Sequence, residues 1–103
     1  MQERIEIIAD HYGYDSQSRQ LIEEMSELTV AINKLWRINQ TEAGKDPIRR
    51  LPCVIAIFEE MADVELMIQQ IKYLMDCEID VEEIKERKIK RQLARIEKED
   101  IKE

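Results

Sequence analysis

Glycine, proline, cysteine and histidine are all scarce in this 103-residue chain, which contains two, two, two and one of them. So few glycines and prolines favour long, uninterrupted helices. The two cysteines, Cys53 and Cys77, lack the CxxC spacing of zinc and redox sites, and we expect both to be reduced core residues. The single histidine, His11, excludes the paired Glu-x-x-His segments of di-iron bundles. It is predicted to lie at a helix end and not to bind a metal.

Long apolar runs and an excess of basic residues are also missing. No stretch approaches the roughly 18 apolar residues of a membrane helix, and no charged-then-apolar leader opens the chain. The formal charge of −7 argues against general nucleic-acid binding, which needs a basic surface. Neither a glycine-rich phosphate loop nor a GxSxG nucleophile turn is present. We therefore expect a cytoplasmic protein that binds neither membranes nor nucleic acid.

What the chain has in abundance is helix-forming residues, above all Glu, Lys, Leu, Met and Gln. Its length fits one domain, residues 1–103. Apolar spacing predicts four helices, at about 2–11, 17–38, 54–75 and 81–98. Gly13 is expected to end the first helix, and Asp15 or Ser16 to cap the second. Asp80 is expected to cap the fourth, with Glu83 completing a capping box. The predicted fold class is all-α.

Residues 39–52 form the longest predicted irregular stretch. They include Gly44, Pro47 and Pro52 together with mixed charges. Connections of about a dozen residues are uncommon in compact domains and often serve a function. Two interpretations stay open, a functional loop and a flexible connector.

An internal near-repeat is the most informative feature of the sequence. Residues 23–32 read EEMSELTVAI and residues 59–68 read EEMADVELMI. The acidic pair Glu24 and Glu27 thus matches the pair Glu60 and Asp63. Within each pair the spacing i, i+3 places both carboxylates on one helix face. Two predicted helices therefore carry the same acidic pattern.

The acidic pairs also have the same position relative to the apolar stripes of their helices. These stripes are Leu21, Met25, Leu28, Ile32 and Leu35, and Ile57, Met61, Val64, Ile68, Ile71 and Met75. At about 100° per residue, the first acid of each pair lies about 60°, and the second about 120°, to the same side of its stripe. An antiparallel helix pair packed through the stripes can bring all four carboxylates together.

Four converging carboxylates need a cation, because like charges at short range oppose ionisation. A cluster of oxygen ligands suits Mg²⁺, with Mn²⁺ as a substitute. The alternative is a solvated acidic helix edge paired with lysine and arginine. The predicted ligands are Glu24, Glu27, Glu60 and Asp63.

At these residues the sequence resembles the MazG-like, all-α nucleoside triphosphate pyrophosphohydrolases. The resemblance rests on Glu24-Met-Ser-Glu27 and Glu60-Met-Ala-Asp63, which are similar to the ExxE and ExxD motifs of that family, and on the flanking LIEEMSELTVAI and FEEMADVELMI. It covers roughly residues 17–96. The 32 residues between Glu27 and Glu60 exceed the family's usual gap, with the excess in the 39–52 loop, and no base-reading motif is recognisable.

The resemblance implies a concrete function. Family members have four-helix-bundle character, assemble as homodimers or homotetramers, and bind Mg²⁺ through the four acids. They hydrolyse a (d)NTP to the monophosphate and pyrophosphate, and so can remove unwanted nucleotides from the pool. On this resemblance the four acids are also the catalytic residues.

Basic residues of the last predicted helix are candidates for binding the substrate phosphates. Lys88, Arg91 and Arg95 share one face, and the family often has a similar Lys and Arg there. The alternative is a solvated basic face paired with Glu82, Glu83 and Glu86. Lys34 and Lys72 are further phosphate candidates. Trp36 can stack on a base, although it lies on the apolar side of its helix, where core packing is the simpler role.

A second class of function stays open. A non-catalytic helical interaction or regulatory module could keep the same scaffold and its acids without turnover. The sequence favours the enzyme, because all four ligand positions are filled.

Overall fold

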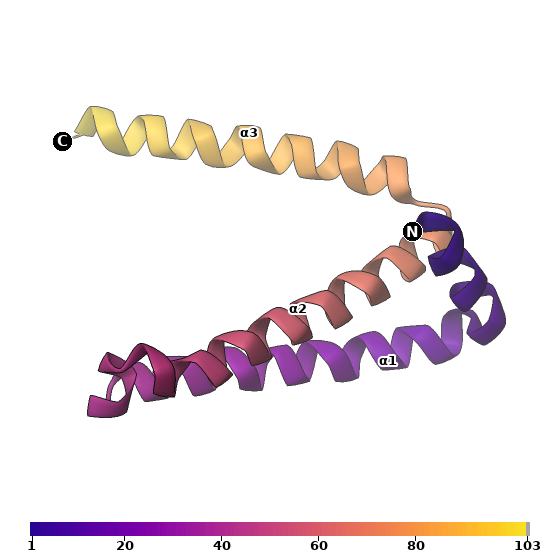
Figure 1. Cartoon of the computed structure of the whole chain (residues 1–103). Helices are drawn as coiled ribbons and strands as arrows, with labels where there is room; N and C mark the ends of the chain where they lie inside the picture. Colours follow the sequence, from indigo (N-terminus) through magenta and orange to yellow (C-terminus); the bar gives the residue numbers. More distant parts are fainter. Residues whose placement is uncertain (103) are drawn as a thin grey trace.

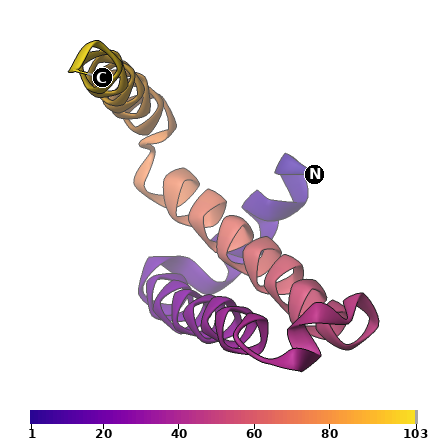
Figure 2. The same ribbon diagram turned by 90° about the vertical axis from the view of Figure 1, so that its left-hand side faces the viewer.

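The computed structural model describes residues 1–102 and confirms the all-α fold class. Helix α1 spans Gln2–Asn39, the short 3₁₀ helix η1 spans Glu42–Lys45, α2 spans Pro47–Met75 and α3 spans Glu78–Lys102. Helices α1 and α2 form an antiparallel hairpin, and α3 leaves the end of α2 as a separate arm (Figure 1). The view turned by 90° shows that α3 diverges from the hairpin and does not lie along it (Figure 2). No strand interrupts residues 1–102.

Helix α1 is broken at Gly13, as the sequence predicted. Gly13 has φ 82° and ψ 170°, values that glycine adopts at little cost because it lacks a Cβ. Helix resumes at Tyr14. Asp15 and Ser16 therefore lie inside the second segment, and the prediction that one of them caps it is wrong. The kink turns residues 2–12 back towards the end of α2.

The predicted loop at residues 39–52 is wrong in its second half. Helix α2 already begins at Pro47, where the Asp46 carboxylate accepts a hydrogen bond from the Ile48 N–H at 3.0 Å. Proline is favoured in a first helical turn, because its missing N–H would have no partner there. Pro52 follows within the helix and removes one hydrogen bond without ending it. The actual connector is residues 40–46.

The connector is tight because Gly44 lies against the end of α1. A Cβ at this position would stand 2.3 Å from the Ile38 carbonyl oxygen. Only glycine allows this approach, so Gly44 fixes how closely α2 starts beside α1.

The seam of the hairpin is displaced from the predicted apolar stripes. In α1 the least exposed residues recur every three or four positions, and in α2 a similar row faces them, as in coiled-coil packing. The α1 row is Gln17, Leu21, Glu24, Leu28, Ala31, Leu35 and Ile38, and the α2 row includes Cys53, Ile57, Glu60, Val64, Met67 and Leu74.

The α1 row lies about 50° to the acidic side of the predicted stripe. Glu24 and Glu60 thus occupy seam positions. Predicted core residues such as Met25 and Ile32 are instead 42% and 49% exposed.

Two polar contacts fix the hairpin far from the connector. Gln17 and Gln70 are both buried, and the Gln17 Nε2 donates to the Gln70 Oε1 at 2.7 Å. Beyond the kink, the Tyr73 hydroxyl donates to Asp10 Oδ2 at 2.8 Å. The apolar residues Ile5 and Ala9 of the turned-back segment are buried. The first segment of α1 is therefore held against the end of α2.

Helix α3 leaves the hairpin through a two-residue corner. Asp76 adopts the left-handed conformation with φ 51°, its N–H donates to the Tyr73 carbonyl, and the Cys77 N–H donates to the Lys72 carbonyl. Helix resumes at Glu78, so Asp80 lies inside α3, and its predicted capping role is wrong. The Lys72 Nζ lies 3.9 Å from Glu82 Oε1 across the corner.

The resulting molecule is open. Its radius of gyration is 18.2 Å, whereas a compact domain of this length has about 13 Å. Within the described residues, no helix is both long enough and apolar enough to cross a membrane.

Candidate metal centre

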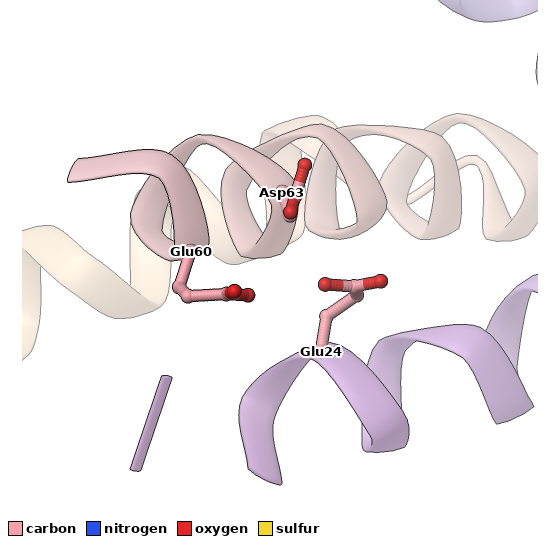
Figure 3. Close-up of side chains that lie close together, drawn as sticks. All are labelled: Glu24, Glu60 and Asp63. Carbon is pink, nitrogen blue, oxygen red and sulfur yellow. The ribbon is translucent and has the colours of Figure 1, made fainter. Parts of the chain in front are cut away.

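Three of the four predicted ligands meet at the seam of the hairpin. Glu24 of α1 and Glu60 and Asp63 of α2 each offer a carboxylate oxygen within 4.8 Å of the other two. Figure 3 shows the Glu24 and Glu60 side chains projecting into the space between the two helices, with Asp63 beside them. The antiparallel pairing expected from the near-repeat thus brings acids together that are 36 or more residues apart in sequence.

Two oxygens of this cluster have lost water without gaining a partner. Glu24 Oε2 and Glu60 Oε2 are buried, and neither accepts a hydrogen bond from any residue in the described chain. Burying a carboxylate oxygen unpaired is unfavourable. None of the ion pairs found among residues 1–102 involves a cluster residue. This argues against the alternative of an acidic edge paired with basic side chains.

The pKa of Glu60 also shows that the carboxylates lie close together. Its pKa is raised above its ordinary value of 4.5, first by burial and then by the charges of Glu27, Asp63 and Glu24. All four predicted ligands are thus electrostatically close. A divalent cation would both provide a partner for the two unpaired oxygens and remove the repulsion, and an all-oxygen donor set suits Mg²⁺ or Mn²⁺.

The fourth predicted ligand, Glu27, lies on the open side of the cluster. It lines a groove of about 360 Å³ together with Glu60 and Lys34. The groove floor contains the small residues Ala31 and Ala56. Glu23 also borders this groove. A ligand held beside the carboxylates thus has room next to Glu27 and Glu60.

The predicted phosphate-binding residues are not beside the carboxylates within one chain. Arg91 and Lys88 border a shallow surface hollow formed only by residues of α3, and no α3 residue lines the groove at Glu27. Arg95, one turn further along α3, is exposed to solvent. Lys34 is the basic residue that shares the groove.

Sequence reasoning missed one polar residue at the cluster. Gln20 Nε2 donates to Glu24 Oε1 at 2.7 Å from one helical turn away. The i, i+4 spacing from a predicted ligand was the available signal. Among the other candidates, His11 is exposed, with its ring perpendicular to that of Tyr12. Cys53 and Cys77 are free but only half-buried, so they are not the fully buried core residues that we predicted.

No family model matches the chain, and no curated protein or solved structure resembles it closely enough to count as a match.

Proposed function

We propose that the protein is a Mg²⁺-dependent nucleotide pyrophosphohydrolase. In this reaction water attacks a (d)NTP, a phosphoanhydride bond breaks, and the products are the nucleoside monophosphate and pyrophosphate. The observation that carries the proposal is the seam cluster, in which two buried carboxylate oxygens lack any partner. The motif resemblance of Glu24, Glu27, Glu60 and Asp63 supplies the reaction class.

In the proposed enzyme the four acids hold the cation. When bound, Mg²⁺ supplies charge neutralisation to the phosphates and acidifies a bound water. Glu27 and Glu60 line the groove and would hold the cation beside it, while Lys34 adds a positive charge that attracts the substrate's phosphates to the same groove. The site keeps water access on this side, as a hydrolase requires.

We also propose that a second copy completes a four-helix bundle, as a homodimer or a tetramer built from dimers. The solvent-accessible surface is 8408 Å², against about 6,100 Å² for a compact monomer of this mass. The excess of about 2,300 Å² per chain is the scale that an obligate homodimer buries. In such an assembly Lys88, Arg91 and Arg95 of one chain meet phosphates bound at the carboxylates of another.

The test is a screen of all common NTPs and dNTPs for pyrophosphate release in the presence of Mg²⁺. We expect at least one substrate to be hydrolysed, and excess EDTA to stop the reaction. Glu60→Ala or Asp63→Ala should lower the rate by more than about 100-fold, beyond the loss typical of a residue that only supports a metal ligand. The matched control is Glu59→Ala, which removes an exposed acid next to the cluster. Full activity in Asp63→Ala, or in EDTA, would overturn the proposal.

The second candidate function is a non-catalytic interaction module. The observation that favours it is α3, whose apolar side chains Ile89, Leu93 and Ile96 are 52–60% exposed. Melting with Mg²⁺ separates the two. A cluster that binds Mg²⁺ is stabilised by about 2.7 kcal/mol when the ion is at 100 times its Kd. No shift at millimolar Mg²⁺, together with no turnover, would favour the module.

A further inference from the structure

The two oxygens of Glu24 have different environments. Its Oε1 accepts a hydrogen bond of 2.7 Å from Gln20 Nε2, while its Oε2 is buried and accepts none in the described chain. Gln20 and Glu24 are both half-buried on the seam side of α1. The Glu24 carboxylate is thus held by one oxygen and free at the other. Glu60 and Asp63 each have a carboxylate oxygen within 4.8 Å of one of the Glu24 oxygens.

The chemical type of the residue at position 20 matters. An amide donates a hydrogen bond without neutralising the acid it holds. A lysine or arginine there would fix Glu24 too, but its charge would compensate the cluster in place of a metal ion. No ion pair of residues 1–102 reaches the cluster, so its negative charge is left for an external cation.

We propose that Gln20 is a positioning residue that orients Glu24 for a divalent cation. This rests on the proposed function only in requiring that the cluster bind such an ion, with or without hydrolysis. Residues that hydrogen-bond to a metal ligand fix its rotamer and thereby strengthen metal binding. Gln20 acts through Glu24 and does not itself contact the ion.

The experiment measures the affinity of the full-length protein for Mn²⁺ by the loss of the free-ion EPR signal, with Mg²⁺ as competitor. Gln20→Leu keeps the size of the side chain but removes the donor, and we expect it to weaken Mn²⁺ binding about 10- to 100-fold. The matched control is Gln40→Leu, since the Gln40 side chain also donates across one turn of α1, to the Trp36 carbonyl, far from the cluster. Gln40→Leu should bind Mn²⁺ as the wild type does.

Gln20→Lys gives the second, opposite readout. Its ammonium should relieve the repulsion among the acids, so the metal-free protein should melt at a higher temperature than the wild type. For the same reason its Mn²⁺ affinity should fall at least as far as that of Gln20→Leu. This variant reports only the charge of the cluster, because an ammonium at position 20 weakens cation binding whatever the role of Gln20. A melting temperature and a Mn²⁺ affinity equal to those of the wild type would place Gln20 outside the site and overturn the inference.

The outcomes separate this inference from the proposed function. If Gln20→Leu binds Mn²⁺ as tightly as the wild type, the positioning role is overturned while the metal site stands. If the wild type binds no Mn²⁺, the metal site and the role of Gln20 are both overturned. If Mn²⁺ binding falls in Gln20→Leu but no nucleotide is hydrolysed, only the enzymatic proposal is overturned.

Discussion

The α1–α2 hairpin and the α3 arm have similar helix-forming sequences but differ completely in burial. All buried side chains of residues 1–101 lie in the hairpin, whereas residues 82–101 of α3 are exposed throughout. The difference lies in what faces each helix. The helices α1 and α2 each provide an apolar row for the other, whereas α3, beyond its first turns at the corner, packs against no other helix of residues 1–102. Helix formation in α3 therefore cannot be explained by packing within one chain, because helical stability in proteins comes mostly from tertiary contacts.

The two regions also differ in charge. Residues 1–77 hold the acidic cluster and account for most of the net negative charge, while α3 has a basic stretch from Lys85 to Arg95. The hairpin therefore contains the acidic cluster that we propose binds a cation, and α3 contains positive charge and an exposed apolar face. This contrast underlies both the enzymatic proposal and the assembly proposal.

The largest expected effect comes from placing a charge in the seam. Ala31→Asp should unfold the hairpin, because it buries an unpaired charge at a position only 6% exposed and costs more than about 3 kcal/mol. Circular dichroism during thermal melting measures this.

Ile89→Asp in α3 provides the comparison. In an isolated chain this exposed substitution should change stability by no more than about 0.5 kcal/mol. If a second copy covers α3, Ile89→Asp should instead dissociate the assembly, which sedimentation at several protein concentrations detects.

A fully stable Ala31→Asp variant would contradict the seam described above.

The next effect is a dependence of stability on pH caused by Glu60 in the acidic cluster. Because Glu60 has a raised pKa, the metal-free fold binds its proton more tightly than the unfolded chain does. Stability without metal should therefore fall as the pH rises from about 4.5 through the higher pKa of the folded state. Glu60→Gln should remove this pH dependence, stabilise the metal-free protein at pH 7 and abolish its stabilisation by Mg²⁺.

Thermal melting between pH 4 and 8, in EDTA and in Mg²⁺, tests this prediction. The control is Glu59→Gln, an exposed acid outside the cluster, which should melt as the wild type does at every pH. A Glu60→Gln variant that is still stabilised by Mg²⁺ would remove Glu60 from the ligand set.

The smallest effect concerns the turned-back first segment of α1. Tyr73→Phe removes the hydrogen bond to Asp10 and should speed amide hydrogen exchange in residues 2–12, while the exchange of residues 17–38 stays unchanged. The pKa of Tyr73 is raised, chiefly by this hydrogen bond. The contact is therefore present below the ordinary tyrosine value of 10 and lost as the pH rises through the higher folded value. Equal exchange in the wild type and Tyr73→Phe would show that the bond does not hold the segment.

The sequence predicted the hairpin's elements because its local signals were strong. Gly13, the apolar spacing and the repeated acids placed the main helices and the pairs that meet. Pro52 misled the prediction, because Asp46 and Pro47 already start the helix one turn earlier, and α2 continues through Pro52 with one hydrogen bond missing. Asp80 also misled the prediction, because it is a typical capping residue but α3 already begins at Glu78.

The seam could not be found from hydrophobicity. A scan for apolar residues selects Met25 and Ile32 and rejects Glu24, whereas the structure packs the row that contains Glu24 and leaves Met25 and Ile32 outward. Acidic side chains between two helices oppose their packing. Apolar contacts made by the rest of the row, or a bound metal ion, must offset this cost, and neither can be recognised in one helix alone. Gln20 was missed because one polar side chain beside a predicted ligand has no sequence signature of its own.

The buried amide pair Gln17 and Gln70 has a consequence for how the chain folds. Because the seam residues of α1 and α2 recur every three or four positions, the two helices could slide past one another by about seven residues and still match apolar side chains. Such a slide would part the two amides and bury each without a partner, at about 1–3 kcal/mol apiece. Competing alignments are thereby made less stable than the native one. The amide pair thus favours one alignment of α1 and α2, and in that alignment the carboxylates of the two helices meet.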